Sequence, residues 1–590
     1  MRAQTWSIGT SCLAFALALG GAPVAAQEGT PGSEAAPAVD GARAVPSGEA
    51  PESVGAPAPQ GGEGTVPATA SDATSTGPTP PAATAPGGPP PSTALPFAYS
   101  LSGYFRARGA TIVNPFLGQA DYTDVGSSPE DDATDRLRAL KRATWFEQGL
   151  RLSPKVAYED LAVLQLDLDV LEGVVWGDNA GLASTPAFAG APSANDRFGA
   201  EVDTFAARRA WLDVKLPLGL LRVGRQPGHW GMGLLANKGD GLEADFGDYH
   251  YGTTYDRVLF ATRPVDVVRG ILGRPAPVKS PLTLALAFDK LVADAITDAL
   301  DSERACSSCA PQIQLADNRD DVDQWVGALL YKDEDARIVA ATDRVVAGAY
   351  VVNRRQRGTR TDVWILDGYA DLRIGHGGLE AEVLWLSGRS SALSGENPKK
   401  IGVFGCVARG GYYDQLLDLL LEVGYAPGDD DPTDPSFSGF ALHPDHNVGL
   451  LLYKEVLAAR TARVWSGDAS GLRSRGGVYN SKYVQPKVRV RPLARLTAIL
   501  GVLWARANKN DGVLWAENRE PKAAGDLDLG FEVDMALRYD LAAHAHLKLE
   551  GGVFFPGRAL WKDQNTDLQI TVADRADPAY TLQARLGFVF

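Results

Sequence analysis

The sequence predicts an all-β protein, a transmembrane antiparallel up-and-down β-barrel of about 18 strands (16 to 20 possible), behind a disordered N-terminal segment. Three observations support this prediction. Long stretches alternate between apolar and polar residues, the connections between them alternate between short and long, and the chain ends on an aromatic residue inside one of these stretches. A period of two is typical of a β-strand with two different faces.

The first 26 residues have the layout of a secretory signal peptide. Arg2 is followed by an apolar stretch from about Ile8 to Leu19, and the small residues Val24–Ala26 precede Gln27. This order predicts cleavage before Gln27 and export. The apolar run is too short to remain as a membrane anchor.

The next segment, residues 27–94, is dominated by Pro, Ala, Gly, Ser and Thr. It has almost no large apolar side chains, so it cannot bury enough surface to offset the entropy of ordering and is expected to be a disordered linker. We interpret it as a spacer, with a cell-wall tether as the alternative. Residues 95–590 contain no comparable linker and are expected to form the outer-membrane barrel.

The alternation is clearest near the C-terminus. Between residues 527 and 539, one parity is apolar and the other carries Asp528, Glu532, Asp534 and Arg538. Charges on one face of so many strands need water beside them. Strands of a β-sandwich average five or six residues, whereas these run to about ten or more, the length that crosses a bilayer at a tilt. The apolar face is therefore expected to meet lipid, and the polar face a wet lumen.

Strand positions follow from the alternating stretches and the turn residues between them. Strands are expected near 97–112, 144–153, 161–171, 205–216, 220–226, 255–262, 281–289, 322–332, 337–353, 361–374, 378–387, 401–409, 413–425, 478–491, 495–507, 526–540, 543–556 and 578–590. Short turns follow the even-numbered strands and long connections follow most odd-numbered ones, as in bacterial outer-membrane barrels. The connection 263–280 is longer than this rule predicts.

The end of the chain supports closure of the barrel. The last strand, Tyr580–Phe590, has no polar tail after its final apolar side chain. Chain termini usually fray, so such an ending indicates a partner strand. An even number of strands puts the start of the first strand and the end of the last on the same side. The last strand is therefore expected to pair with the first.

Two stretches carry a resemblance to a known group. Leu221–Ala261 has a Gly-Arg-Gln strand end, a Trp-containing Gly-rich loop and an Asp-Arg-Val strand start. Leu421–Leu457 has a strand that leads into a Gly-Asp-Asp-Asp-Pro loop and a later His-Asn-Val-Gly. Both resemble outer-membrane porins of the alginate-export type and, more closely, an uncharacterised family of predicted outer-membrane barrels in high-GC Gram-negative bacteria. The resemblance implies an eighteen-stranded pore, an outward-facing Gly428–Pro435 loop and lumen arginines that hold a uronate chain.

The candidate pore-lining residues lie on the lumen parity. The basic ones are Arg106, Arg108, Lys487, Arg489, Arg491 and Arg585. The chain departs from the family pattern because the same parity also carries acids, namely Asp167, Asp169, Glu380, Glu382, Asp528, Glu532 and Asp534. If the first and last strands pair, Arg106, Arg108 and Arg585 form one basic wall. Opposed charges in a wet constriction select solutes by sign and dipole; the alternative is that these side chains only solvate the lumen and pair with one another.

Two loops contain groups with further chemistry. Asp429, Asp430, Asp431 and Asp434 offer a density of oxygens that suits Ca²⁺. They lack the spacing of an EF-hand, and a solvated acidic tip is the alternative. In an oxidising compartment, Cys306 and Cys309 are expected to form a local disulfide, with a redox or metal role as the alternative. No other cofactor is expected.

These features together predict a porin-like channel for polar solutes, with anionic and saccharide solutes as candidates, in the outer membrane of a Gram-negative bacterium. The chain shows no nucleophile elbow, phosphate loop or zinc-protease helix, so no enzyme is expected. The alternative function is a plugged barrel that acts as a surface-binding or envelope-structural protein. The long connections expected to fold inward are 113–143, 173–204, 226–254, 290–321 and 427–477.

Expected partners follow from this location. They are outer-membrane lipid and lipopolysaccharide, the barrel-assembly machinery through the C-terminal strand, and a small polar solute or saccharide. A formal net charge of −15 argues against nucleic acid, which requires a basic surface.

Overall fold

The structure, a computed structural model, describes residues 96–590 apart from 116, 118–141, 178–202, 243, 250–251, 275–278, 294–321, 341–342, 392–396, 430–433, 459–473, 475, 510–526, 564–572 and 575. The expected signal peptide (1–26) and linker (27–94) lie outside these residues and stay predictions.

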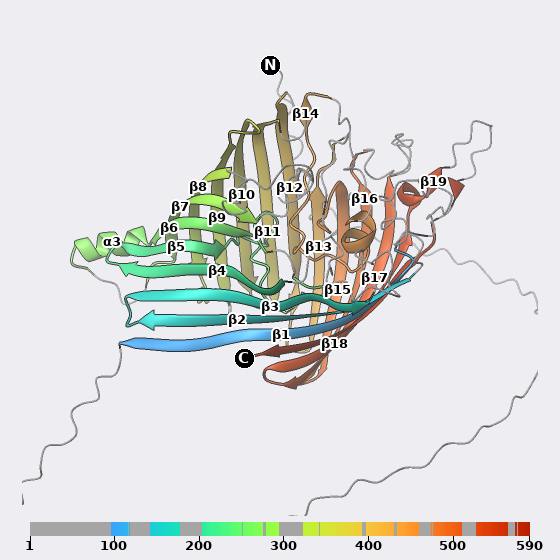
Figure 1. Cartoon of the computed structure of the whole chain (residues 1–590), viewed down its shortest axis with the longest axis horizontal. Coiled ribbons are helices and arrows are strands. Elements are labelled where there is room, and N and C mark those ends of the chain that lie inside the picture. Colours follow the sequence, from blue (N-terminus) through green and yellow to red (C-terminus); the bar gives the residue numbers. More distant parts are fainter. Residues whose placement is uncertain are drawn as a thin grey trace, which may run out of the picture. The chain divides into compact units, whose positions relative to one another are not determined.

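The described chain is almost entirely β-structure (Figure 1). Its long strands are β1 (Phe97–Val113), β2 (Arg142–Tyr158), β3 (Ala162–Gly177), β4 (Asp203–Leu216), β5 (Gly219–Pro227), β6 (Thr254–Thr262), β7 (Leu282–Ala293), β8 (Val322–Asp333), β9 (Arg344–Gln356), β10 (Thr361–Ile374), β11 (Gly377–Ser390), β12 (Lys399–Tyr413), β13 (Leu417–Ala426), β15 (Ser481–Leu493), β16 (Leu496–Ala507), β17 (Asp528–Ala542), β18 (Ala545–Pro556) and β21 (Ala579–Val589). The short elements are α3 (Pro264–Ile271), β14 (Ser436–Phe437), η2 (Leu452–Leu457), η4 (Arg558–Leu560), β19 (Lys562–Asp563) and β20 (Ala573–Asp574).

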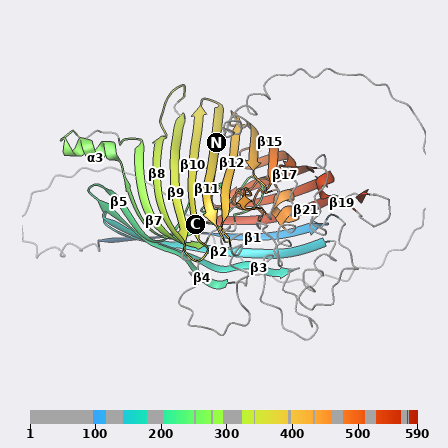
Figure 2. The same ribbon diagram turned by 90° about the horizontal axis from the view of Figure 1, so that it is seen from above.

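Eighteen antiparallel strands of the described residues form one closed barrel. Each strand pairs with the next in chain order, and Figure 2 shows this order running around the barrel. The ring is closed by β21, which pairs with both β18 and β1. Beyond the ladder, Gly103 and Phe590 exchange two backbone hydrogen bonds of 2.9 and 3.0 Å. The predicted pairing of the last strand with the first is therefore confirmed. The two-residue β14 lies parallel to β12 and adds no strand to the ring.

The two faces of each strand differ as the alternation predicts. In β17, Phe531, Met535 and Leu537 are exposed on the outer face, whereas Glu532 and Asp534 on the inner face are fully buried. Apolar residues on the outside of a closed ring are suited to acyl chains. The inner charges are not simply hydrated, because other parts of the chain cover them.

Connections alternate in length along the ring. Short turns join β2 to β3, β4 to β5, β10 to β11, β12 to β13, β15 to β16 and β17 to β18. The first strand begins and β21 ends at this same rim. Two connections at this rim are longer. The one between β6 and β7, as the sequence indicated, contains the helix α3. The one between β8 and β9 comprises residues 334–343, so the predicted short turn there, with a strand starting near 337, is wrong. No helix in the described part of the chain is long and apolar enough to cross a membrane.

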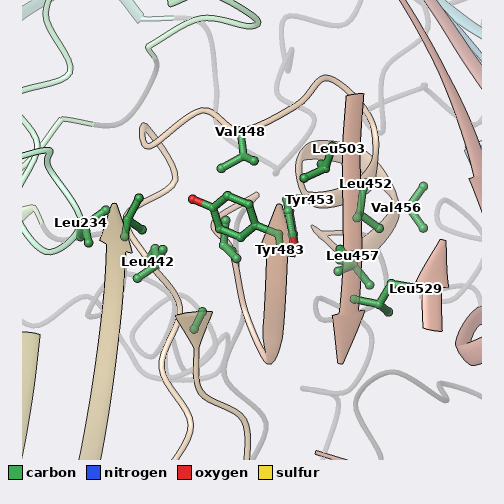
Figure 3. Close-up of a cluster of buried hydrophobic side chains, with 14 of the residues drawn as sticks. Leu234, Leu442, Val448, Leu452, Tyr453, Val456, Leu457, Tyr483, Leu503 and Leu529 are labelled. Atoms are coloured by element: carbon green, nitrogen blue, oxygen red, sulfur yellow. The ribbon is translucent and has the colours of Figure 1, made fainter. Parts of the chain in front are cut away.

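Two segments from the opposite rim occupy the interior. The β5–β6 segment comprises residues 228–253, and the β14–η2 segment comprises residues 438–458. Together with the wall they bury one apolar cluster, part of which Figure 3 shows. In this cluster Leu234 from the first segment and Leu442 and Leu452 from the second lie near Tyr483 and Leu503 of the wall. The described parts of two connections predicted to fold inward, 226–254 and 427–477, therefore do so; most of 113–143, 173–204 and 290–321 lies outside the described residues.

Candidate functional site

The seam of the barrel carries the predicted basic wall. Closure places Arg108 directly opposite Arg585 in the ladder between β1 and β21. Both guanidinium groups bind one carboxylate of the β5–β6 segment, since Asp248 lies 2.9 Å from Arg108 Nη1 and 2.7 Å from Arg585 Nε. Arg106 Nη1 donates a 2.8 Å hydrogen bond to the carbonyl oxygen of Tyr249. The basic wall therefore anchors an inserted segment.

The wall opposite the seam holds the other part of the same segment. Glu382, on β11, accepts hydrogen bonds from the backbone N–H groups of Met232 and Leu234. Trp230 Nε1 donates a 3.2 Å hydrogen bond to Asp367 Oδ1, and its ring stacks on Tyr350. Contacts on both sides of the barrel show that the β5–β6 segment spans the lumen.

Arginines of β2 and β4 form a third anchor. Arg151 binds the carboxylate of Asp169 through two hydrogen bonds of 2.6 and 2.8 Å, and Arg209 lies 3.4 Å from Asp167. Both arginines also reach Asp240 of the β5–β6 segment, at 3.0 and 2.6 Å. Asp167 and Asp169 therefore pair with other wall residues, as the alternative interpretation of the lumen charges expected.

Asp245 ties the β5–β6 segment to β15. Its carboxylate lies 3.4 Å from Lys487 Nζ and 2.5 Å from Arg489 Nη2. Burial by itself raises the pKa of Asp245, but the charges of Lys487 and Arg489 outweigh burial and lower this pKa to about 2. The carboxylate is therefore ionised at neutral pH and bound to two cations.

The β14–η2 segment is held mainly by one buried carboxylate. Glu532 accepts hydrogen bonds from three consecutive backbone N–H groups, those of Leu450, Leu451 and Leu452, at 2.6, 2.8 and 2.7 Å. These groups lie at the start of η2, where no intrahelical partner is available to them. Charge-assisted hydrogen bonds of this kind are among the stronger ones in proteins.

The two inserted segments also bind each other. His443 donates its backbone N–H to the carbonyl oxygen of Leu234 at 2.7 Å, and its ring lies 3.1 Å from the hydroxyl of Thr253. Gly252 donates a 2.8 Å backbone hydrogen bond to Asp445. The segments therefore form one unit inside the barrel.

A cavity of about 700 Å³ lies between this unit and the wall. Seven lysine and arginine side chains line it, against five aspartates and glutamates. The cations are Lys238, Arg409, Lys487, Arg489, Arg491, Arg538 and Lys548, and the anions are Asp240, Asp245, Glu380, Asp445 and Asp540. Arg491 and Arg538 lie near the ends of β15 and β17, so the cavity reaches toward the rim of short turns.

Three arginines of this cavity are more accessible than the acids of β13 that pair with them. Arg489 and Arg491 bind Asp418 of β13 at 2.9 and 2.6 Å. Their side chains are 23 and 33 % exposed, whereas that of Asp418 is 3 % exposed. Arg409 likewise binds Glu422, which is fully buried, at 2.7 Å. Along these strands the guanidinium groups therefore face the cavity, and the carboxylates of Asp418 and Glu422 lie behind them.

A comparison of the sequence with known protein families finds a match over part of the chain. Residues 365–574 match the family described as alginate export. This part of the chain, from within β10 to β20, is similar to that family. The apolar outer face of the closed barrel is suited to lipid.

Among solved structures, the chain is similar to several Pseudomonas proteins. Pseudomonas aeruginosa OccK9 (OpdG) is 13% identical, with 83% of this chain and 98% of that chain covered and a TM-score of 0.43. Pseudomonas aeruginosa OccK2 (OpdF) in complex with glucuronate is 12% identical over 83% and 98% of the two chains, with a TM-score of 0.41. A BenF-like porin from Pseudomonas fluorescens Pf-5 is 10% identical over 83% and 98%, with a TM-score of 0.42. No curated protein matches the sequence.

The prediction for one of the pore-lining residues is wrong. Asp528, at the start of β17, is exposed and opposes Arg506 on the outer parity, and it does not face the lumen. The ladder shifts by one residue between Ala505 and Arg506, where Gly530 has a φ of 103°. A bulge of this kind reverses the face of the residues before it.

The remaining predicted residues lie on the inner face. Arg106, Arg108, Asp167, Asp169, Glu382, Lys487, Glu532, Asp534 and Arg585 are buried there, while Glu380, Arg489 and Arg491 line the cavity. Glu380 accepts a 2.9 Å hydrogen bond from the hydroxyl of Tyr369.

Two predicted loop features are only partly described. Asp430 and Asp431 lie outside the described residues, while Asp429 is buried near the hydroxyl of Ser438 and Asp434 accepts from Ser436. Within the described residues no cluster of three metal-ligating side chains occurs. The calcium site stays a prediction.

Cys306 and Cys309 also lie outside the described residues, and the fourth cysteine, Cys406 of β12, is disulfide-bonded. The local Cys306–Cys309 disulfide therefore stays a prediction.

The sequence analysis missed several residues that shape the site. Asp418 and Glu422 share one parity of β13 and Arg409 belongs to β12, so the alternation could have identified them. No local pattern marks Asp245 and Asp248, because they lie in an irregular segment between β5 and β6. Their importance depends on contacts with distant strands.

The lowered pKa of Asp245 leads to a prediction about the pH dependence of the barrel. A carboxylate whose folded pKa is lowered stabilises the folded arrangement fully above its ordinary pKa of 3.8, and this contribution is lost as pH falls through about 2. We expect Asp245→Asn to increase conductance flicker equally from about pH 7 to pH 4. The difference from wild type should shrink toward about pH 2.

Single-channel recording over this pH range checks the expectation. Asp160→Asn, in the fully exposed turn between β2 and β3, is the control and should leave flicker unchanged. A wild-type channel that already flickers at about pH 5 in the manner of Asp245→Asn would contradict the assigned role.

Proposed function

We propose that the barrel is a channel for small polar solutes with a preference for anions, and that the cavity beside the two inserted segments forms part of the solute path. The observation that supports this proposal is the arrangement of charge along β12, β13 and β15. Arg489 and Arg491 are partly exposed in the cavity while their partner Asp418 is buried behind them. An anion in the cavity meets guanidinium groups first.

The size of the effect follows from elementary electrostatics. A unit charge about 4 Å from an ion contributes about 1 kcal/mol in bulk water, and more beside low-dielectric walls. Since about 1.4 kcal/mol is a factor of ten, two accessible guanidinium groups are sufficient to bias permeation by sign. The carboxylates that also line the cavity reduce this bias without removing it, because cations outnumber them.

The lining favours solutes with several polar groups. Arginine offers fixed pairs of donors for a carboxylate, and Tyr249 and Asn447 add hydrogen-bonding groups for hydroxyls. Small carboxylates and acidic saccharides therefore fit the proposed path.

A plugged barrel with a surface-binding or envelope-structural role is the second candidate. It is favoured by the number of contacts that tie the inserted segments to the wall and to each other, including the three hydrogen bonds to Glu532. Planar-bilayer recording of the purified barrel distinguishes the two functions. Stable ohmic steps support the channel, and a folded but silent barrel supports the structural role.

Selectivity is tested with the double variant Arg489→Ser, Arg491→Ser. The change removes two cavity cations and leaves Asp418 without either guanidinium partner. We expect the anion-to-cation permeability ratio to fall by about fivefold or more. Reversal potentials in a salt gradient measure this ratio. The matched control is Arg222→Ser, because Arg222 pairs with Asp213 in the wall and does not line the cavity. An unchanged ratio in the double variant would remove these arginines from the solute path.

Two further partners stay predictions of the sequence, namely lipopolysaccharide at the outer rim and the barrel-assembly machinery at β21. The second is supported by the exposed apolar side chains on the outer face of β21, among them Tyr580, Leu582 and Phe588. Normal assembly of a chain that lacks β21 in cells would contradict it.

A further inference from the structure

The long connection between β6 and β7 contains a helix that the channel function does not use. Helix α3 spans Pro264–Ile271, and none of its residues is buried. It lies at the rim of short turns, where six other strand pairs are joined by only two or three residues. Figures 1 and 2 both show α3 projecting outward from the barrel wall.

The helix has an apolar stripe. Val268, Ile271 and Leu272 are 54, 75 and 65 % exposed. Residues three and four positions apart lie on one face of a helix, so these side chains form a continuous strip. The next connection on the same rim, between β8 and β9, also exposes Ile338 and Val339. Exposed apolar side chains therefore occur on two successive connections of this rim.

The connection is basic in an acidic protein. Residues 263–280 carry the cations Arg263, Arg269, Arg274 and Lys279 against the single acid Asp266, whereas the whole chain has a formal net charge of −15. The one acid is engaged within the connection, because both carboxylate oxygens of Asp266 accept a 3.0 Å hydrogen bond from the backbone N–H of Ser280. This contact joins the beginning of the helix to the start of β7.

The strands on either side of the helix carry part of the lipid-facing surface. Val258 of β6 and Leu286 of β7, in the strands on either side of α3, expose apolar side chains on the outer face. A short basic amphipathic helix at the edge of such a surface has the composition of a segment that lies in the plane of a membrane interface. Its cations are attracted to anionic headgroups.

We infer that α3 binds the inner leaflet of the outer membrane, with Val268, Ile271 and Leu272 among the acyl chains and the flanking cations on anionic phospholipid headgroups. The helix then anchors the barrel at the height of its short-turn rim. This inference concerns lipid contact and does not depend on which solutes the channel passes.

Depth-dependent quenching tests the inference in the full-length barrel. A fluorescent amino acid is placed at Ile271 by stop-codon suppression, and the barrel is reconstituted in vesicles of brominated phosphatidylcholine with or without phosphatidylglycerol. We expect quenching several-fold greater than for the same label at Asp160, whose side chain is fully exposed in the turn between β2 and β3. Quenching should be stronger when phosphatidylglycerol is present.

A charge variant tests the headgroup contact separately. Each cation near an anionic surface is worth about fivefold in partition, so Arg263→Gln, Arg269→Gln and Arg274→Gln together should abolish the dependence of Ile271 quenching on phosphatidylglycerol. These side chains are exposed or partly exposed, and conductance steps confirm that the variant still forms a barrel.

Three results would overturn the inference. The first is equal quenching of the labels at Ile271 and Asp160. The second is protection of the Ile271 label from both brominated lipid and aqueous iodide, which indicates that a protein or a second copy of the chain covers the helix. The third is retention of the phosphatidylglycerol dependence in the charge variant.

Discussion

Excision of residues 229–252 should raise the single-channel conductance several-fold. Pro227 of β5 and Thr254 of β6 are already opposite each other in the ladder, so a short Gly-Ser turn can join the strands without moving them. Barrels of 16 to 18 strands leave an aqueous channel unless something fills it. Here the β5–β6 segment crosses the lumen from the seam at Asp248 to Glu382 on the opposite wall. Its removal opens that path.

The same excision should also change selectivity. Arg108 and Arg585 lose their shared partner Asp248, and Arg106 loses the carbonyl of Tyr249. These cations then face water, so anion preference should increase in reversal-potential measurements. Heat modifiability on a gel is the control for an intact barrel, since the strand ladder does not include the excised residues. Unchanged conductance in a folded variant would mean that the segment does not restrict the pore.

Glu532→Ala is expected to release the β14–η2 segment from the wall. The substitution removes the acceptor for the backbone N–H groups of Leu450, Leu451 and Leu452 in a buried environment. Each unsatisfied buried group costs about 1–3 kcal/mol, so the inserted arrangement should lose on the order of 3 kcal/mol or more. A loss of that size is roughly a hundredfold in the population of released states.

Single-channel recording measures this population as the fraction of time in high-conductance substates. Asp213→Ala is the matched control, because Asp213 pairs with Arg222 within the wall and its loss removes a lumen-side carboxylate without touching η2. Glu532→Gln should give an intermediate effect, since an amide retains one oxygen acceptor but presents donors in place of the other. Identical substate occupancy in Glu532→Ala and Asp213→Ala would show that Glu532 does not hold the segment.

The strands were largely predictable because their signal is local. The expected strand 361–374 has the bounds observed for β10, and the other seventeen expected strands each correspond to one observed strand. Side chains alternate between the two faces of a strand, so once the face of one residue is known, the faces of the others in that strand follow. Asp528 shows the limit of this rule, because one extra residue at the Gly530 bulge reverses the assignment.

The candidate site was predictable only in part. Arg108 and Arg585 could be brought together from the sequence, because barrel closure alone makes their strands neighbours. Their partner could not be found in this way. Asp248 lies in an irregular segment, and the local sequence contains no information about which wall such a segment will reach.

The sequence by itself determined the strand order, the lipid-facing and lumen-facing sides, and the pairing of the last strand with the first. These features follow from the alternation and the turn residues, which are patterns of a few neighbouring positions. Only the tertiary structure decided what the inner charges bind. Arg106 meets Tyr249 across 143 positions, and Glu382 meets Leu234 across 148. Such contacts form when a long connection enters the closed barrel, where buried charges need partners that the strands alone do not provide.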